Sequence, residues 1–513
     1  MDLLRKASSH LHRPAVIHKG IPYTYETLLT ASEDLSRRIS KRIPHSAGQT
    51  PPRVGLHATP GIEYIIGTLA IWRSGGIAVP LAVSHPPAEL AYVFQDAGLS
   101  LALTDEEAAA KVGEVASSNG AVSEVIERPA GSPAATAAST SAGTYAPAEQ
   151  PQPAPGAASE AGALIIYTSG TTGKPKGVLH THRSLAAQCT TLCGAWGWSQ
   201  SDRILHTLPL HHVHGIVNAA YCPLSVGGCI DFMPKFSPSA VWARLMEGRT
   251  SVFMGVPTMY ALLLSAYDAM APDQQAAARR AAAGLRLTVS GSSACPVPIM
   301  KRWKELSGQY LLERYGMTEI GMALSNPYQG GERRPGSVGQ PLPGVQVAVA
   351  PDGELLVKGP MLFTEYWGRA QATRDAFDGS GFFRTGDTVA VDAGTGCYAI
   401  QGRTSVDILK VGGYKVSALD VEGALLEHPG VAEVAVLGVP DEVYGQVITA
   451  VVAAKDPAAA AGLPDALRAH CATRLAPYQA PKRYHPVAAI PRNAMGKVNK
   501  VELLRALREG RLA

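Results

Sequence analysis

The chain has 513 residues, of which 46% are hydrophobic and 17% are charged, and its formal net charge is +4. This is the composition of a globular protein with ample length for large cores. Basic residues are scattered and form no long run, which argues against nucleic-acid binding. Seven cysteines, an odd number without a Cys-x-x-Cys pair, argue against a disulfide framework or a zinc site and favour a reducing compartment.

No membrane span is predicted from the sequence. The longest apolar region, Tyr64–Val83, is interrupted by Arg73, two glycines and Pro80. The N-terminus carries no apolar signal core, and the final residues Gly-Arg-Leu-Ala are not a peroxisomal signal. We therefore expect a soluble cytoplasmic protein, with a mitochondrial or plastid matrix as the alternative if a presequence was removed.

Strands and helices alternate along the first part of the chain. Ala15–His18 and Tyr23–Tyr25 flank Gly20 and predict a hairpin. Later segments predict helices at 63–74 and 88–97 among strands at 53–57, 77–80, 101–104, 163–167, 204–209, 230–233, 252–256 and 285–290. This alternation predicts an α/β fold with a parallel sheet. The Ala-, Pro- and Ser-rich stretch 129–162 cannot bury enough apolar surface to offset its ordering entropy, so we interpret it as a disordered insertion.

From Gly344 the pattern changes to short strands separated by turn residues, at 345–349, 355–358 and 397–401. After Gly402-Arg403 the pattern is mixed, with helices predicted at 418–428 and 464–475 and strands at 431–439 and 447–455. We therefore predict the α/β fold class in two parts. Residues 1–402 form a large N-terminal domain of parallel α/β layers with a small β-rich subdomain. Residues 403–513 form a C-terminal α+β domain.

The segment after the strand at 163–167 carries the strongest chemical signal: Thr168-Ser-Gly-Thr-Thr-Gly-Lys-Pro-Lys-Gly177. Its glycines let backbone N–H groups approach phosphate oxygens, its hydroxyls donate hydrogen bonds, and its lysines neutralise a polyphosphate. It is not a Walker A loop, because Pro175 occupies the Ser/Thr position. We predict that ATP phosphates are bound by Thr168, Ser169, Gly170, Thr171, Thr172, Gly173, Lys174 and Lys176.

This loop resembles the phosphate-binding loop of the adenylate-forming superfamily, which includes acyl-CoA synthetases, peptide-synthetase adenylation domains and luciferases. Further motifs of that superfamily follow in order over nearly the whole chain: Tyr315-Gly-Met-Thr-Glu319, Arg384-Thr-Gly-Asp387, Gly402-Arg403 and Pro491-Arg-Asn-Ala-Met-Gly-Lys497. The resemblance implies an enzyme that activates a carboxylic acid with ATP and Mg²⁺ and passes the acyl group to coenzyme A.

The resemblance also implies a role for each motif. Glu319 and Thr171 would hold Mg²⁺, which prefers oxygen ligands, and Thr318 would donate to the α-phosphate. Asp387, an acceptor when ionised, would bind the ribose hydroxyls, and Arg403 would add a donor fork. The remaining ATP-binding residues would be Gly291, Ser292, Tyr315, Gly316 and Met317.

Lys497 would bridge the attacking carboxylate and the α-phosphate and so offset their repulsion; losing such a contact costs about 3–4 kcal/mol. No general base is needed, since a carboxylate is ionised at neutral pH. In the family the C-terminal domain rotates between the two half-reactions, and Asp407 is the expected hinge. The second setting would bring to CoA the glycine-rich stretch with Lys410, Gly412, Gly413 and Tyr414.

The segments most similar to eukaryotic malonyl-CoA synthetases are His211–Gly215, Leu312–Pro327, Pro335–Gly339, Pro341–Val345 and Gly402–Asp407. This similarity implies malonate as the acid, with malonyl-CoA, AMP and pyrophosphate as products. A buried distal carboxylate needs a cation, and we assign Arg286 to it. His214 would help, His212 would lie at the gate, and Met322 would also line the pocket.

One position departs from the bacterial malonate ligases, which carry an arginine two residues after the tyrosine of Val-Pro-Thr-x-Tyr. Here Leu262 stands at that place, and Arg244 or Arg249 could substitute. A surface arginine at a strand start is the alternative interpretation of Arg286. For the function, three alternatives stay open: a ligase for methylmalonate or another short acid, an adenylation module that loads a carrier-protein thiol, and a non-catalytic nucleotide-binding regulator.

Overall fold

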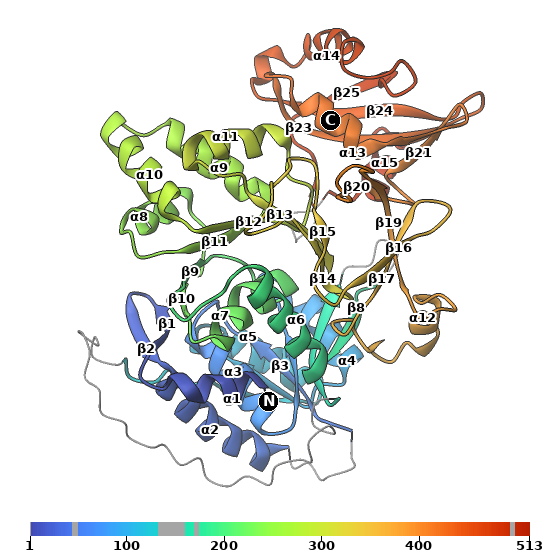
Figure 1. The fold of residues 1–513 in the computed structure, drawn as a ribbon. Helices are drawn as coiled ribbons and strands as arrows, with labels where there is room; N and C mark the ends of the chain where they lie inside the picture. Colours follow the sequence, from blue (N-terminus) through green and yellow to red (C-terminus); the bar gives the residue numbers. More distant parts are fainter. Residues whose placement is uncertain (1, 44–49, 132–159, 169–173, 493–497, 513) are drawn as a thin grey trace.

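The computed structural model describes residues 2–43, 50–131, 160–168, 174–492 and 498–512, and these form four sheets (Figure 1). Two large sheets of nine and seven strands belong to the N-terminal part, and a four-stranded sheet follows them. The residues from Ile408 onward add a five-stranded sheet. The α/β fold class predicted from the sequence is confirmed, because most neighbouring strands of the two large sheets are parallel.

The seven-stranded sheet contains β7 and β8, the two strands on either side of the predicted phosphate-binding loop, which is called the phosphate-type loop below. Its strands, in spatial order, are β18 (Glu365–Tyr366), β8 (Lys176–Thr181), β7 (Gly162–Thr168), β4 (Ile77–Pro80), β3 (Arg53–His57), β5 (Leu101–Thr104) and β6 (Val122–Val125). Its helices are α3 (Ile62–Arg73), α4 (Pro87–Ala97) and α5 (Ala109–Ser118). Helix α3 is buried on nearly all sides, because α2 (Tyr25–Arg42) covers the face that α3 turns away from the sheet.

The nine-stranded sheet holds the other half of the site. Its spatial order is β15 (Gln340–Pro341), β14 (Gly321–Ser325), β13 (Leu312–Met317), β12 (Leu287–Ser290), β11 (Val252–Gly255), β9 (Arg203–His206), β10 (Cys229–Phe232), β1 (Pro14–His18) and β2 (Ile21–Thr24). The helices that cover it include α6 (His182–Ala195), α8 (Pro238–Met246), α9 (Pro257–Asp268), α10 (Pro272–Gly284) and α11 (Val297–Ser307). Strands β1 and β9 to β13 are parallel, so their carboxyl ends meet at one edge, where ligands bind in open α/β sheets.

The remaining two sheets are antiparallel or mixed. The four-stranded sheet consists of β16 (Gln346–Val349), β17 (Glu354–Lys358), β19 (Phe383–Val391) and β20 (Tyr398–Arg403). The last sheet consists of β21 (Ile408–Val411), β22 (Tyr414–Ser417), β23 (Val431–Asp441), β24 (Gly445–Ala454) and β25 (Arg483–Val487), with helices α13 (Ala418–Leu426), α14 (Leu463–Ala472) and α15 (Lys500–Arg508). Two apolar clusters formed by residues beyond 408 give this unit its own core.

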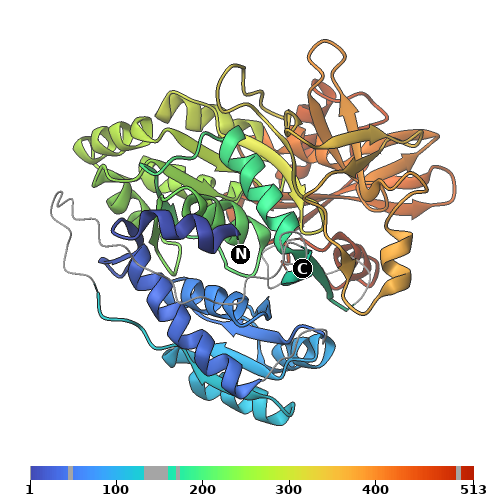
Figure 2. The ribbon, with the colours of Figure 1, turned by 60° about the horizontal axis from the view of Figure 1, so that its bottom comes forward.

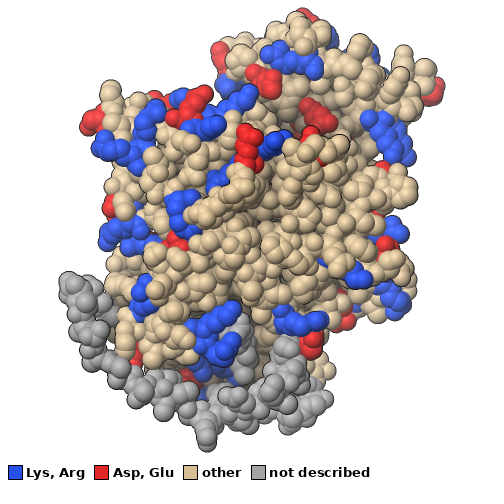
Figure 3. Space-filling view, viewed as in Figure 1, with Lys and Arg blue, Asp and Glu red and all other residues tan. Residues whose placement is uncertain are grey.

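In Figure 2 the blue N-terminal helices lie against the part that carries the green helices, with the orange and red C-terminal segments on the other side, and one apolar core joins the blue and green parts. Figure 3 shows basic and acidic side chains scattered over one face, in keeping with the small net charge. No helix in the described part of the chain has the length and apolar character that crossing a membrane requires.

The strands predicted at 53–57, 77–80 and 101–104 are confirmed at both ends. The strand predicted at 204–209 ends earlier, at His206, ahead of Pro209, which has no N–H to donate. Strand β8 was not predicted; it pairs antiparallel with β7, so the phosphate-type loop closes a hairpin. Most of the predicted insertion 129–162 lies outside the described residues.

Candidate active site

The phosphate-type loop connects the two strands of a hairpin. Thr168 at the end of β7 pairs with Lys176 at the start of β8, and residues 169–173 between them lie outside the described part. Lys174 Nζ lies 5.6 Å from the centroid of the Tyr92 ring, and Lys176 Nζ lies 4.6 Å from that of Tyr366. Aromatic faces attract ammonium groups without neutralising them, so both charges stay available to an anion at the loop.

Glu319 lies buried in the turn between β13 and β14. Its Oε1 accepts a hydrogen bond of 2.9 Å from the Tyr366 hydroxyl. The neighbouring Thr318 carbonyl accepts a bond of 2.7 Å from His180 Nε2. Burial lowers the pKa of His180 to about 4, so its ring is neutral at pH 7. Because Lys176 packs on the same tyrosine ring that binds Glu319, a cation and a carboxylate stand close together at the loop.

Asp387 is the centre of a second polar group, contributed by the four-stranded sheet. It pairs in register with Arg403, whose Nε lies 3.1 Å from Asp387 Oδ1. The Tyr315 hydroxyl donates to Asp387 Oδ2 at 2.5 Å. Burial raises the pKa of Asp387, while Arg403 and Tyr315 act in the opposite direction. Three residues predicted from separate motifs therefore meet at one carboxylate.

Arg314, directly before Tyr315 on β13, was not predicted as a site residue. Its side chain is buried, and its Nε and Nη2 have no hydrogen-bond partner in the described part of the chain. A Cβ placed on Gly291 would stand 2.4 Å from the Arg314 Cζ, so only glycine leaves room for this guanidinium. Burial lowers the pKa of Arg314 to about 10, which keeps it charged at pH 7. A buried cation without an anion is expensive, so this position fits a negatively charged ligand.

Unpartnered polar groups also come from the π-helix η3 (His214–Tyr221). Neither ring nitrogen of His214 and neither amide atom of Asn218 has a partner among the described residues. Burial, reinforced by the charge of Arg314, holds the pKa of His214 well below its ordinary value, so the ring is neutral. π-Helical turns are rare and are frequent at functional sites. His212 is half-buried near this helix, with its ring 4.2 Å from that of His211.

The other predicted nucleotide and acid residues lie on the same strands. Met322 on β14 is paired with Gly316 on β13, and a Cβ on Gly316 would stand 2.7 Å from the Met322 Cε. Met317 ends β13. Ser292 follows β12 with a φ of +71°, a left-handed conformation uncommon for a residue with a side chain. Such backbone strain clusters at functional sites.

The AMP-binding enzyme family model matches residues 3–367, and the model of the AMP-binding enzyme C-terminal domain matches residues 420–497. The chain belongs to the AMP-binding enzyme family. A malonate–CoA ligase of Arabidopsis thaliana is 42% identical to it over 538 residues, which cover 98% of this chain and 87% of that protein. The resemblance to the adenylate-forming superfamily is confirmed, and with it the prediction of an AMP-forming acid–thiol ligase.

Two solved structures differ in how well they superpose. ATP-bound MatB from Rhodopseudomonas palustris is 30% identical and has a TM-score of 0.82, with 99% of each chain covered. A malonyl-CoA ligase with methylmalonyl-CoA and AMP bound is 36% identical, yet its TM-score is 0.67, with 96% of this chain and 99% of that chain covered. This chain superposes better on the ATP-bound structure.

Arg286 is already paired with a carboxylate of the chain, which argues against its predicted role at the distal carboxylate. It precedes the amino end of β12, whereas Gly291 follows the carboxyl end. Its Nε and Nη2 form a bidentate pair with the Asp202 carboxylate at 2.5 and 2.6 Å, and its Nη1 donates to the Trp196 carbonyl. Arg286 stands at a strand start, as in the alternative interpretation, but its side chain is only 23% exposed and is not a surface group.

The possible substitutes for Arg286 are also paired with acids. Arg244 lies 3.8 Å from Asp231 and 3.5 Å from Glu247, and Arg249 binds the same Glu247. Leu262 is exposed on α9.

Arg314 could have been found in the sequence, since it is a charged residue inside an otherwise buried strand directly before a recognised motif.

The predicted CoA residues lie on the hairpin of β21 and β22. Gly412 and Gly413 form its turn with φ values of +54° and +86°, which glycine adopts readily, and Lys410 precedes them on β21. The Gly412 N–H donates to the Tyr444 carbonyl at 2.9 Å. The exposed Tyr414 ring stacks on another tyrosine, Tyr478, at 4.4 Å. Lys497 lies outside the described residues.

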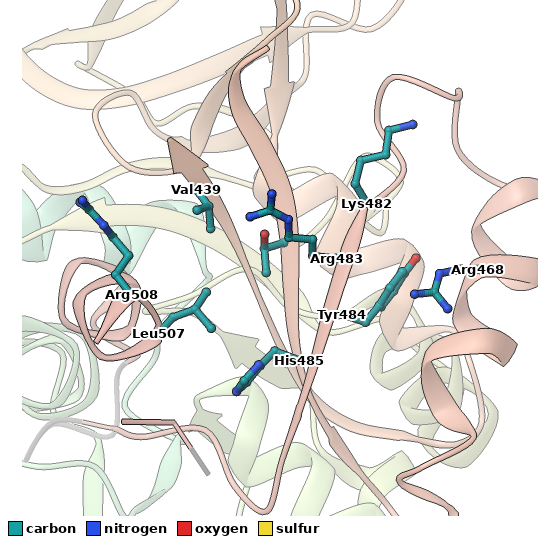
Figure 4. A pocket seen from close by; sticks show the side chains of 9 residues that line it. Val439, Arg468, Lys482, Arg483, Tyr484, His485, Leu507 and Arg508 are labelled. Atoms are coloured by element: carbon teal, nitrogen blue, oxygen red, sulfur yellow. The ribbon is translucent and has the colours of Figure 1, made fainter. Parts of the chain in front are cut away.

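A basic pocket of about 540 Å³ opens beside this hairpin, on the C-terminal sheet (Figure 4). The nine residues that line it include five that can carry positive charge: Arg468, Lys482, Arg483, His485 and Arg508. Thr449 Oγ1, also in the lining, is buried without a partner in the described part of the chain. Arg483 lies 3.9 Å from Asp441, which accepts the N–H of Tyr444 and so connects the pocket with the Gly412 turn.

Proposed function

We propose that this chain is an ATP-dependent malonate–CoA ligase, which forms malonyl-CoA, AMP and pyrophosphate through a malonyl-adenylate. The observation that carries the choice of acid is the buried, unpartnered guanidinium of Arg314. The name of the Arabidopsis relative supports the same choice.

Malonate has two carboxylates, and only one of them reacts. The other stays ionised at neutral pH and must be paired if it is buried. The Arg314 Nε and Nη2, both free of protein partners in the described part of the chain, form the fork that binds a carboxylate through two parallel hydrogen bonds. His214 and Asn218 can add donors beside it. A monocarboxylic acid would leave this cation unpaired, so the pocket favours a dicarboxylate.

In the first half-reaction the reacting carboxylate attacks the α-phosphate, and the bond to the β-phosphate breaks to release pyrophosphate. Lys174 and Lys176 would bind the phosphates, Asp387 and Arg403 would bind the ribose, and Lys497 would offset the repulsion between the two anions. In the second half-reaction the CoA thiol replaces AMP at the carbonyl carbon.

The Glu319 carboxylate fits Mg²⁺, because Tyr366 occupies only Oε1 and Mg²⁺ is held by one or two carboxylate oxygens together with phosphates. Glu319 and Thr171 would hold the ion, which would neutralise phosphate charge. Glu319 itself is oriented by the tyrosine hydroxyl before the nucleotide binds.

For CoA we propose the β21–β22 hairpin with Lys410, Gly412, Gly413 and Tyr414, and the adjoining basic pocket suits the phosphates of CoA. The domain boundary at 402/403 and the hinge at Asp407 belong to this proposal. So does a cytoplasmic, mitochondrial or plastid location, which the free cysteines support.

The test compares Arg314→Gln with Arg286→Gln, an arginine of the same sheet that is already paired. Thioester formation is measured with malonate, methylmalonate and acetate. Arg314→Gln should lower kcat/KM for malonate about 10²-fold and change acetate little, since a buried charge pair is lost only with the dicarboxylates. Arg286→Gln should affect all three acids alike. A loss shared equally by all acids in Arg314→Gln would contradict the proposal.

A further inference from the structure

Three charged side chains form a buried cluster beside the connection from β20 to β21. Lys500 Nζ lies 2.5 Å from Asp407 Oδ1 and 2.7 Å from Glu422 Oε1. The side chains of Lys500, Asp407 and Glu422 are 11%, 12% and 14% exposed, respectively. They come from three places in the chain: the first residue of α15, the connection itself, and α13. Burial lowers the pKa of Lys500, but the two carboxylates outweigh it and raise the pKa overall, so the ammonium is charged.

The two contacts of Lys500 differ in what they join. Glu422 belongs to the C-terminal unit, where its Oε1 also accepts the Val436 N–H at 2.7 Å. Asp407 belongs to the connection, where its Oδ2 accepts the Arg403 N–H at 2.9 Å. The Lys500–Glu422 pair therefore lies within the C-terminal unit. The Lys500–Asp407 pair instead connects α15 of that unit with the segment that leads from β20 to β21.

The contacts of Asp407 continue to the proposed nucleotide site. The Arg403 backbone is bound to Asp407, and the Arg403 side chain is bound to Asp387. A continuous series of contacts thus connects the proposed ribose carboxylate with α15. Lys500, the last member of the series, stands three residues after Lys497 in the sequence.

We propose that Lys500 is a positioning residue for adenylate formation, which it favours by holding the Asp407 carboxylate. This inference rests on the proposed function. The chain superposes on the ATP-bound relative with a TM-score of 0.82 and on the relative with methylmalonyl-CoA and AMP bound with a TM-score of 0.67. On that basis we assign the Lys500–Asp407 pair to the setting that uses ATP. A rotation about residue 407 would change this pair and leave Lys500–Glu422 intact.

The experiment compares Asp407→Asn with Glu422→Gln in the full chain. Each change removes one carboxylate charge from the same ammonium, and each keeps an oxygen for its backbone N–H partner. Two half-reactions are measured: malonate-dependent exchange of pyrophosphate into ATP without CoA, and single-turnover transfer of preformed malonyl-adenylate to CoA. Asp407→Asn should slow the exchange about tenfold and the transfer less than about twofold. Glu422→Gln should change both by the same factor.

Equal losses in Asp407→Asn, or a selective loss in Glu422→Gln, would overturn the inference. If Asp407→Asn does not fold, Lys500→Gln, which keeps a donor but loses the charge, must show the selective loss of exchange; equal losses there overturn it too. Failure of the proposed function would look different, because the unaltered protein would then show no malonate-dependent exchange at all.

Discussion

The two halves of the site differ in how their polar side chains are satisfied. On the nucleotide side, Asp387 is bound by Tyr315 and Arg403, and Glu319 is bound by Tyr366. On the acid side, Arg314, His214 and Asn218 carry buried polar atoms without a partner in the described part of the chain. In the proposed site the protein itself therefore orients the nucleotide half, whereas a ligand would complete the acid half.

This difference separates two kinds of effect. Every acid is activated by the same ATP, so a change on the nucleotide side should lower the rate by one factor for all acids. A change on the acid side should discriminate between acids, because only some of them pair the buried charge. The first two predictions below test the two sides of this contrast, and the third concerns the charge next to Arg314.

The largest effect is expected from Glu319→Gln. Removing the carboxylate that faces the phosphates and the metal should lower kcat about 10²–10³-fold for every acid. Pyrophosphate release with malonate and with acetate, at several Mg²⁺ concentrations, measures it. Tyr366→Phe, which leaves the carboxylate but removes its hydrogen bond, is the control and should cost only a few-fold. If Glu319→Gln lowered the rate with malonate but not with acetate, the proposed difference between the nucleotide half and the acid half would be contradicted.

A smaller and selective effect is expected from His214→Leu. Losing one donor beside the distal carboxylate should lower kcat/KM for malonate about tenfold and leave acetate nearly unchanged. His57→Leu is a matched control, since His57 on β3 is equally buried and both its ring nitrogens also lack partners in the described part of the chain. If the His57 variant discriminates between the acids as strongly, His214 has no specific role.

The smallest effect concerns stability. Burial raises the pKa of Glu313, next to Arg314, from 4.5 to about 7. A carboxyl with a raised pKa contributes stability that is complete below about pH 4.5 and is lost as pH rises through about 7. The free energy of unfolding should therefore fall between pH 5 and pH 7 by about 1 kcal/mol per pH unit from this group.

Glu313→Gln should flatten that decline, and urea unfolding at pH 5, 6, 7 and 8 measures it. Glu107→Gln, at a carboxylate whose side chain is 73% exposed, is the control and should leave the decline as it is. Parallel declines for the Glu313 variant and the unaltered protein would show that Glu313 does not titrate in this range.

Much of the nucleotide half could be predicted from the sequence because its residues lie in short contiguous motifs. Glu319, Asp387 and Arg403 each stand in a segment whose residue types suit one chemical task, and the structure brings the last two together at 3.1 Å. Strand β3 was predicted at both ends, because it is a short segment bounded by turn-forming residues.

The acid half was predicted less well, and Arg286 and Arg314 show why. Arg286 directly precedes a strand and Arg314 lies within one, and their local sequences do not tell which one has a partner. Asp202 neutralises Arg286 from 84 positions away, while no carboxylate in the described part of the chain bonds to the Arg314 guanidinium. Pairing between distant residues depends on which strand ends meet, and that is a property of the packed sheet.

By itself, the sequence determined the α/β class, the family and the chemistry of ATP activation, because local patterns of apolar residues, glycines, hydroxyls and charges carry that information. Only the tertiary structure showed which buried arginine has unpartnered nitrogens in the described part of the chain, because that depends on how all the other charges are paired. The same holds for the contact of Lys500 with Asp407, two residues 93 positions apart. The local sequence shows which reactions the side chains can support. Whether a buried charge has a partner depends on all the groups packed around it.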